Sequence, residues 1–398
     1  MSGHSLIDNA IFGVLVTSGD LSIPAVARSL EMPTSTANGI VQRLVEEGRI
    51  ERESVVSAGA TRRGRPAARY RPRLLKPVAA CALDGSSLSV GLVDRDLSLV
   101  GRHDRRFRAR EMGQVLELIV ESFDEACAEA GMKRKQFAGL ALSANVLTMA
   151  QGVVSSSVLP WIGVEAIQHC RSALGMEVRL LQHAHLIAAY QGIEPPRPRM
   201  MVRFNVGDGV SAHQLTGGRP HAGASGMAGE LGHTIVDPDG PLCGCGRRGC
   251  LEALASGPAI CRALIERATP AVMTRLDRAW LAATPPSQAF DAVYEAWLAG
   301  DGAVVSVMEK VLDDLARTLA TALNMLDPDQ VLASGYVLQN HPQWLDQLEQ
   351  RMRRWVFQLD RRNLRLVPEH TDVEQVLRVA ALLFSYPACF DAFTGRCP

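Results

Sequence analysis

The sequence lacks any apolar run long enough to cross a bilayer, which takes about 20 residues. The longest runs, such as that within Arg378–Phe384, are far shorter. The start, Met-Ser-Gly-His-Ser, also lacks the basic and then apolar order of a secretion signal. These absences predict a cytoplasmic protein with no membrane partner.

Acidic residues are absent from Ser54–Pro77, although 42 basic and 42 acidic residues balance over the whole chain. Such a local excess of positive charge predicts that this segment binds a polyanion. Its basic residues are Arg62, Arg63, Arg65, Arg69, Arg71, Arg73 and Lys76.

A Cys-x-x-Cys pair is also missing, which disfavours a redox site, although the chain has nine cysteines. Only Cys243, Cys245 and Cys250 cluster, and we expect the other six to be reduced thiols. With 47% hydrophobic and 21% charged residues, the composition is that of a soluble globular protein. A length of 398 residues predicts two or three domains.

The first segment predicts two short helices joined by a turn near Glu31–Pro33. Ser22 is a plausible N-cap, Pro24 is tolerated in the first turn, and Gly48 is suited to end the second helix. An apolar helix over Leu6–Val16 would complete a small core.

The second of these helices is expected to be amphipathic, because Ala37, Val41, Leu44 and Val45 recur at helical spacing. This layout is typical of a helix-turn-helix module whose second helix enters the major groove, although any amphipathic helix pair has a similar pattern. The candidate DNA contacts on its polar face are Thr34, Ser35, Thr36, Asn38, Gln42 and Arg43.

A short strand at 50–53 and a basic arm follow, which is the order of a winged helix. The arm contains Arg63-Gly-Arg-Pro66, and its compact cationic residues suit a narrow minor groove. Arg62, Arg63 and Arg65 are therefore further DNA-contact candidates, and a solvated linker between domains is the alternative.

The pattern in the rest of the chain predicts an α/β body of two lobes, each of which begins with a strand and a glycine turn. Strands are expected at 78–94, 97–105, 136–143 and 177–181, with a helix at 112–130 and more alternation at 184–191. A new strand and glycine turn begin near residue 199. We expect a winged module at 1–76, a first lobe at 77–195 and a second lobe with a C-terminal helix at 196–398. A ligand cleft is expected between the lobes.

Three motifs of the second half together resemble the signature of the ROK family, which contains bacterial sugar kinases and winged-helix, sugar-responsive repressors. They are Gly229-Glu-Leu-Gly-His233, Cys243-x-Cys-Gly-x-x-Gly-Cys-x-Glu252 and Ala255-Ser-Gly. The resemblance covers nearly the whole chain, and the N-terminal module and Gly-Arg-Pro arm belong to the repressor branch. It implies an actin-like, ribonuclease-H-like fold of two lobes, sugar between them, and a homodimer or tetramer.

The cysteine cluster predicts a metal site, because the glycines between Cys243, Cys245 and Cys250 let the three thiolates turn toward one ion. The resemblance implies His233 as the fourth ligand, which gives a closed set for one structural Zn²⁺ per chain. Small buried thiols and a core histidine are the alternative. A DNA-reading zinc finger is disfavoured, since no second cysteine pair or Cys2His2 set is present.

The resemblance also implies where a kinase would hold nucleotide phosphates, namely an Asp-x-Gly-x-Thr turn and a Gly-x-Gly-x-Gly turn. In the first turn, Asp84 is kept, but Ser86 and Leu88 replace the glycine and the threonine. The second turn, Gly207-Asp-Gly-Val-Ser211, places an aspartate where phosphates would lie.

The family's catalytic aspartate position holds His183 in this chain. Because positioning the phosphoryl group is most of what such an enzyme supplies, these changes predict a protein with no catalytic residue and no kinase activity. The sugar contacts of the family fall on Ser157, Gln182, His183, Glu230, His233 and Glu252, and only the second-lobe half keeps the family's residue types. We expect an unusual sugar or sugar derivative as effector, or a pocket that has lost its ligand.

The sequence therefore predicts a regulator of transcription, a repressor by its resemblance, that binds operator DNA and a sugar-type effector. An active ROK sugar kinase and a zinc-containing sugar-binding protein without DNA affinity are the alternatives.

Overall fold

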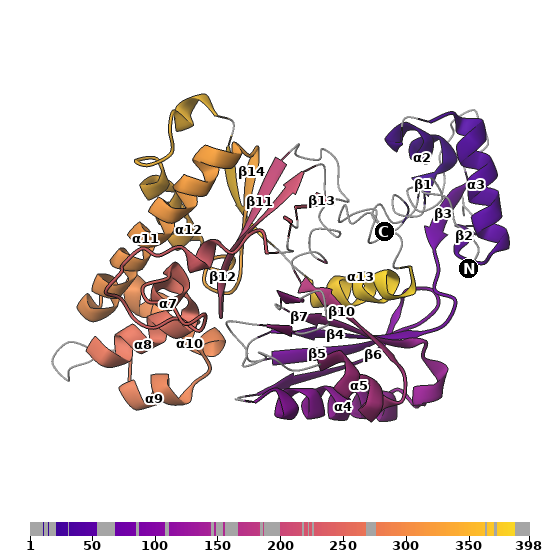
Figure 1. Cartoon of the computed structure of the whole chain (residues 1–398), viewed down its shortest axis with the longest axis horizontal. Helices are drawn as coiled ribbons and strands as arrows, with labels where there is room; N and C mark the ends of the chain where they lie inside the picture. The colour runs from indigo at the N-terminus through magenta and orange to yellow at the C-terminus, as the bar shows by residue number, and fades with distance from the viewer. Residues whose placement is uncertain are drawn as a thin grey trace.

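The computed structural model places most of the chain in three units (Figure 1). It describes residues 11, 15, 21–30, 32–53, 68–84, 87–107, 111–144, 147–148, 154–155, 166–183, 186, 200–216, 219–221, 223–224, 227–267, 276–362, 364–369 and 372–386. Within these ranges, none of the helices combines the length and the hydrophobicity that a membrane span requires.

The N-terminal unit consists of two helices and a small sheet. Helix α2 (Ile23–Ser29) precedes α3 (Thr34–Glu46), and strands β1 (Leu21–Ser22), β2 (Ile50–Glu53) and β3 (Arg69–Pro72) pair in the order β1-β3-β2. The buried faces of the two helices meet because Val26, Ala37, Val41 and Leu44 lie at helical spacing, and Ile11 and Leu15 join the same core.

The helix boundaries of this unit follow the sequence pattern closely. Gly48 has a φ of +69° just beyond α3, as expected for a residue that ends a helix. Ser22 does stand at the N-cap of α2, but its side chain makes no capping hydrogen bond there. Of the helix expected at 6–16, only Ile11 and Leu15 lie within the described residues, and both are helical.

The first lobe is built on a five-stranded sheet in the order β10-β7-β4-β5-β6. Its strands are β4 (Val78–Leu83), β5 (Ser87–Val93), β6 (Leu99–Arg106), β7 (Gly139–Ala144) and β10 (Glu177–Gln182). Helices α4 (Met112–Glu129) and α5 (Ala166–Leu174) cover one face (Figure 1). Strands β8 (Leu147–Thr148) and β9 (Val154–Ser155) pair separately.

The second lobe is built on another five-stranded sheet, in the order β13-β12-β11-β14-β15. Its strands are β11 (Met200–Val206), β12 (Val210–Thr216), β13 (Arg219–Pro220), β14 (Gln330–Ser334) and β15 (Arg365–Pro368). Its helices are α7 (Leu251–Ala255), α8 (Gly257–Arg267), α9 (Arg278–Ala283), α10 (Pro286–Leu298), α11 (Gly302–Leu326) and α12 (Pro342–Met352). One face of the sheet, with Phe204 and Val331, joins the largest apolar core, which includes Leu312 and Trp344 of the helices.

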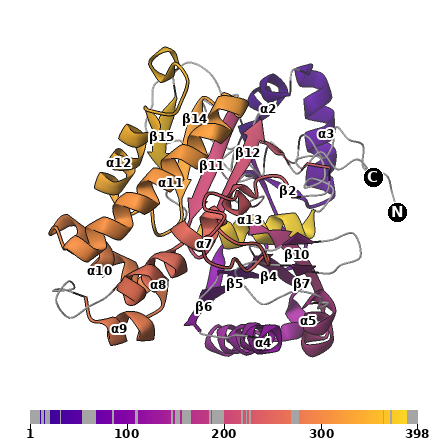
Figure 2. The same ribbon diagram turned by 60° about the vertical axis from the view of Figure 1, so that its left-hand side comes forward.

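The last described helix, α13 (Val373–Ser385), lies against the other face of the first-lobe sheet, opposite α4 (Figure 2). This differs from the expectation that residues 196–398 form one lobe. The chain leaves β15 and crosses back, and Leu377 and Leu383 pack in the same core as Val78 and Ala141. A hydrophobic face predicts that a helix is buried, but it does not identify the sheet that buries it.

Tyr386, at the end of α13, joins the first lobe to the N-terminal unit. Its ring centroid lies 5.0 Å from the guanidinium carbon of Arg49, which follows α3. Its hydroxyl donates to the carbonyl of Arg73, which follows β3. The N-terminal unit is therefore attached to α13 by specific contacts as well as by the chain itself.

The strand expected at 136–143 begins later, at Gly139, because Arg134–Gln136 forms a 3-10 turn in which the Gln136 side chain accepts from the Lys133 backbone amide. Most of the alternation expected at 184–191 lies outside the described residues.

Candidate metal centre and interlobe residues

The loop that carries the clustered cysteines is shaped by its glycines. Gly246 and Gly249 have φ values of +87° and +68°, which glycine adopts far more readily than other residues. The Gly246 amide donates to the Cys243 carbonyl, which closes a tight turn over residues 243–246, and the Cys243 amide donates to the Arg247 carbonyl. A Cβ on Gly249 would lie 1.4 Å from the carbonyl oxygen of Asp237, so this position admits no side chain.

The four predicted ligands converge. The ligand atoms of His233, Cys243, Cys245 and Cys250 all lie within 4.8 Å of one another. The Cys245 and Cys250 sulfurs are 3.7 Å apart, and the Cys243 sulfur is 3.6 Å from His233 Nδ1. Sulfurs bound at about 2.3 Å to one tetrahedral ion would stand about 3.8 Å apart, so these residues fit a metal of zinc's size and ligand preference.

Two carboxylates adjoin this centre. Glu230 Oε2 lies 3.7 Å from His233 Nε2, the ring nitrogen that faces away from the sulfurs. This separation is that of an ion pair and is longer than the hydrogen bond through which a carboxylate orients a ligand histidine. Glu252, which is buried in α7, accepts a hydrogen bond from the Val210 amide at 3.1 Å, and its other oxygen lies 3.9 Å from the Cys243 sulfur. Glu252 therefore links the metal loop to the turn before β12.

The predicted effector residues fall into two groups. Glu230, His233 and Glu252 lie together around the metal centre, as the preceding distances show. His183 lies on the first lobe, where its Nδ1 is 3.0 Å from the Ser143 hydroxyl. The side chain of Gln182, which ends β10, and all of Ser157 lie outside the described residues.

The surroundings of His183 favour its neutral form. Burial and, to a lesser extent, the charges of Arg203 and His213 on the second lobe together lower the pKa of His183 to about 3. Arg203 itself is buried and paired with Glu369, whose carboxylate lies 2.8 Å from Arg203 Nη2. The two lobes are thus close enough here for a charge on one to affect a group on the other.

The second phosphate-type turn is occupied by its own side chains. The Tyr336 hydroxyl donates to Asp208 Oδ1 at 2.7 Å. Burial, and after it the charge of Asp84 from the first-lobe turn, raise the pKa of Asp208 to about 6 even though the Tyr336 hydrogen bond lowers it. An acidic group that already repels a neighbouring carboxylate would also repel an entering phosphate.

The tyrosine in this contact was missed by the sequence reading. Tyr336 follows Gly335, whose φ is +82°, at the end of β14. Its ring lies 3.6 Å from where a Cβ on Gly207 would be, and its hydroxyl lies 2.0 Å from where a Cβ on Gly257 would be. A signal was present in Gly335-Tyr336, a glycine turn directly after an apolar strand with a bulky residue at its tip.

The predicted DNA-contact residues on α3 share one exposed face. Thr34, Ser35, Thr36, Asn38, Gln42 and Arg43 are all exposed. The Gln42 amide nitrogen lies 3.3 Å from the hydroxyl of Tyr70 on β3, which ties the helix to the small sheet. Arg62, Arg63 and Arg65 lie outside the described residues.

Comparison with known proteins identifies the family. The model of the ROK family matches residues 80–385 of this chain. The chain belongs to the ROK family. Among solved structures, a ROK family transcriptional regulator, a homolog of the E. coli Mlc protein, superposes with a TM-score of 0.67 at 21% identity over 98% of both chains. A ROK glucokinase from Streptomyces griseus, in complex with glucose and AMPPNP, gives a TM-score of 0.63 at 21% identity over 77% of this chain and 98% of its own.

These similarities confirm the α/β fold shared with the two-lobed sugar kinases. In sequence, glucokinase from Thermotoga maritima is 34% identical over 135 residues, which are 34% of this chain and 42% of that protein. N-acetylmannosamine kinase from Citrobacter koseri is 55% identical over 65 residues, 16% of this chain and 22% of that protein. The chain therefore spans less than half the length of these relatives, which include sugar kinases.

Proposed function

We propose that this ROK protein is a DNA-binding regulator of transcription, a repressor, that responds to a sugar or sugar derivative. The observation that carries the proposal is the N-terminal unit: two helices followed by a hairpin, with six polar residues exposed along α3. This is the layout of a winged helix, in which the second helix enters the major groove and the basic arm reaches the backbone or minor groove. The domain boundaries 1–76, 77–195 and 196–372, with α13 returned to the first lobe, are part of this proposal.

The same proposal holds that the body does not phosphorylate its ligand. A nucleotide needs a cradle of amide groups and positive charge, whereas this turn presents Asp208 held by Tyr336. A general base works best with a pKa near the working pH, and the pKa of His183 is lowered to about 3. In this proposal, the phosphate-binding turn and the general-base position therefore both lack the chemistry that phosphoryl transfer requires.

A structural Zn²⁺ held by His233, Cys243, Cys245 and Cys250 completes the proposal. Four protein ligands leave no open position for substrate, so the ion would stabilise the loop without taking part in a reaction. Because Glu252 bonds the Val210 amide, the metal loop and the β11–β12 turn would move together.

The link between effector and DNA is proposed to run through α13. An effector between the lobes shifts the protein only by binding one arrangement of the lobes more tightly than another. Helix α13 follows β15 of the second lobe, packs on the first-lobe sheet and ends at Tyr386 against Arg49 and Arg73 of the N-terminal unit. A change in the angle between the lobes would therefore reach the DNA-binding helices.

Selection of genomic DNA fragments by the purified protein, repeated with a panel of sugars, tests the proposal. We expect an enriched operator motif and a loss of binding with one sugar or sugar derivative. Operator binding should fall steeply with salt. Arg43→Ala should weaken it while Arg278→Ala, an exposed arginine of the second lobe, should not.

The alternatives give different results in the same experiments. An active kinase would show phosphorylation of a sugar above background in a coupled assay. A sugar-binding protein without DNA affinity would enrich no motif yet still bind a sugar.

A further inference from the structure

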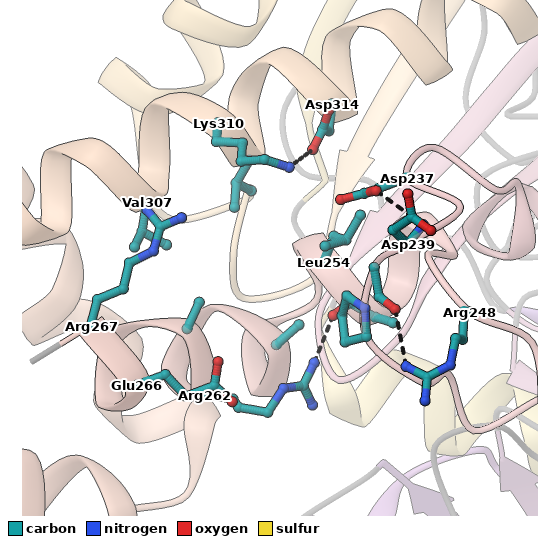
Figure 3. Close-up of a pocket in the computed structure, with 16 residues that line it drawn as sticks. Asp237, Asp239, Arg248, Leu254, Arg262, Glu266, Arg267, Val307, Lys310 and Asp314 are labelled. Atoms are coloured by element: carbon teal, nitrogen blue, oxygen red, sulfur yellow. Dashed lines mark hydrogen bonds and ion pairs between the residues drawn. The ribbon is translucent and has the colours of Figure 1, made fainter.

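A pocket of about 420 Å³ lies beside α7, between the segment 237–241 and helices α8 and α11 (Figure 3). Its apolar lining includes Leu254, Val307 and Val311, and its rim carries charged side chains. This volume is in the range of sites for small molecules. Among the residues that the structure describes, none of those placed in the proposed DNA or effector sites lines it.

One wall of the pocket is formed by α8 and carries two guanidinium groups. Arg262 Nη2 donates to the Ala253 carbonyl at 2.6 Å, and Arg267 Nη1 donates to the Ser306 hydroxyl at 3.4 Å. Neither arginine forms an ion pair with any of the residues that the structure describes. Because each guanidinium has five N–H donors, most of them remain for a ligand.

The facing wall is formed by the segment 237–241, which leads into the cysteine loop, and carries Asp237 and Asp239 (Figure 3). The Asp237 carboxylate is engaged only locally among the described residues, since its Oδ1 accepts from the Asp239 amide at 3.3 Å. In the described part of the chain, neither carboxylate pairs with a cation. A third acid of the rim, Asp314, is already neutralised by Lys310 and Arg317, at 3.3 and 2.7 Å.

The two walls also contain Glu266, one turn beyond Arg262 on α8, and Arg248 on the loop. The rim as a whole is therefore balanced rather than basic or acidic, which disfavours a ligand of one charge. Guanidinium groups and carboxylates that face each other across an apolar floor without pairing leave room for a molecule that is charged oppositely at its two ends.

We propose that this pocket binds a compact amphoteric molecule of the tripeptide type. Its carboxylate would lie along the α8 wall between Arg262 and Arg267, since planar guanidinium groups suit a carboxylate, and its ammonium group at Asp237 and Asp239. An extended tripeptide spans roughly 10 Å, a length that such a volume accommodates. The ligand would touch α7 directly beside Glu252, and it does not depend on the proposed DNA or sugar binding.

Calorimetric titration of the full chain with trialanine at low salt tests this proposal. We expect saturable binding of trialanine, and binding about tenfold weaker for both N-acetyl-trialanine and trialanine amide, since each lacks one charged end. Arg262→Gln and Arg267→Gln should each weaken trialanine binding and reduce the preference for the free carboxylate. Asp239→Asn should reduce the preference for the free amine. Arg278→Gln, the same substitution on α9 outside the pocket, should leave all three affinities unchanged.

The pattern across peptides and variants decides the outcome. No saturable heat with trialanine, or equal binding of all three peptides, would overturn the proposal. So would loss of the heat of trialanine binding when inorganic phosphate is present at the same concentration as the peptide, because that result indicates a simple anion site. Circular dichroism of each variant distinguishes a loss of binding from a loss of folding. Because Arg262 also bonds the Ala253 carbonyl of α7, Arg262→Gln could disturb that helix, and Arg267→Gln tests the same wall without that contact.

Discussion

Two regions of the body contact the same turn, between β11 and β12, but have different chemistry. We call them the metal corner, which is the cysteine cluster with Glu252, and the phosphate corner, which is Asp208 with Tyr336. At the metal corner, four ligands converge within 4.8 Å and Glu252 bonds the turn at Val210. At the phosphate corner, Asp208 and Tyr336 bond to each other. The first corner brings together donor atoms that suit a metal ion, whereas the second presents a carboxylate that would repel a phosphate. Under the proposed function, the first corner stabilises the fold and the second no longer supports phosphoryl transfer.

Loss of the metal ion from the proposed metal site should have the largest effect on stability. Cys250→Ser, or treatment with a strong chelator, should release the ion and lower the Tm by on the order of 10 °C, because binding energy of a structural metal is also folding energy. Elemental analysis and thermal unfolding measure both quantities. Cys261→Ser, a buried thiol outside the cluster, is the matched control and should retain the metal. Purified protein that folds normally with well under one metal per chain would contradict the metal site.

The buried ion pair near the lobe boundary should rank second. Glu369→Ala leaves the Arg203 guanidinium buried without its partner and should lower the free energy of unfolding by about 3–5 kcal/mol. Denaturant unfolding at neutral pH measures the loss. The double variant Arg203→Met with Glu369→Leu should recover much of it, since no charge then stays buried. A Glu369→Ala protein of unchanged stability would show that this boundary is open to water.

A substitution at the phosphate corner should have the opposite effect and raise the free energy of unfolding. The folded pKa of Asp208 is raised to about 6, above its ordinary value near 3.8, so the folded state holds the proton more tightly. Stability from this group is therefore present below about pH 4, falls as the pH rises toward 6, and is absent above that. Asp208→Asn should raise the free energy of unfolding by roughly 1–3 kcal/mol at pH 7.5 and by little at pH 4.

Denaturant unfolding at both pH values tests this, with Asp346→Asn as an exposed control on α12. If Asp208→Asn destabilises the protein at pH 7.5, the carboxylate has a favourable partner and the corner is not built against anions.

The smallest effect is expected at the joint with the N-terminal unit. Tyr386→Phe keeps the ring against Arg49 but removes the hydroxyl that donates to the Arg73 carbonyl, and should cost about 1 kcal/mol. Under the proposed function, it should also shift the effector concentration that releases operator DNA, measured by gel shift. Tyr70→Phe, which instead loses the contact with Gln42, should not shift it. If Tyr386→Phe and the unsubstituted protein release operator DNA at the same effector concentration, the Tyr386 hydroxyl does not take part in the response to the effector.

The sequence predicted the elements whose signals are local. The cysteine and glycine spacing indicated the metal loop, and the helical recurrence of Ala37, Val41 and Leu44 indicated α3, because each depends on residues close in the chain. The side of the sheet on which α13 packs was not predictable, since its apolar face fits any sheet. The Tyr336–Asp208 bond joins residues 128 apart, and such a pairing has no signature within a window of sequence.

The return of α13 to the first lobe also sets an order for folding. The first-lobe sheet is complete at residue 182, but one of its faces stays uncovered until residues 373–385 have been synthesised. The N-terminal unit likewise waits for Tyr386 to meet Arg49. Contacts between such distant parts of the chain form slowly, and the exposed face is a surface on which nascent chains can associate. The part of the protein that is made first is therefore among the last to reach its final state.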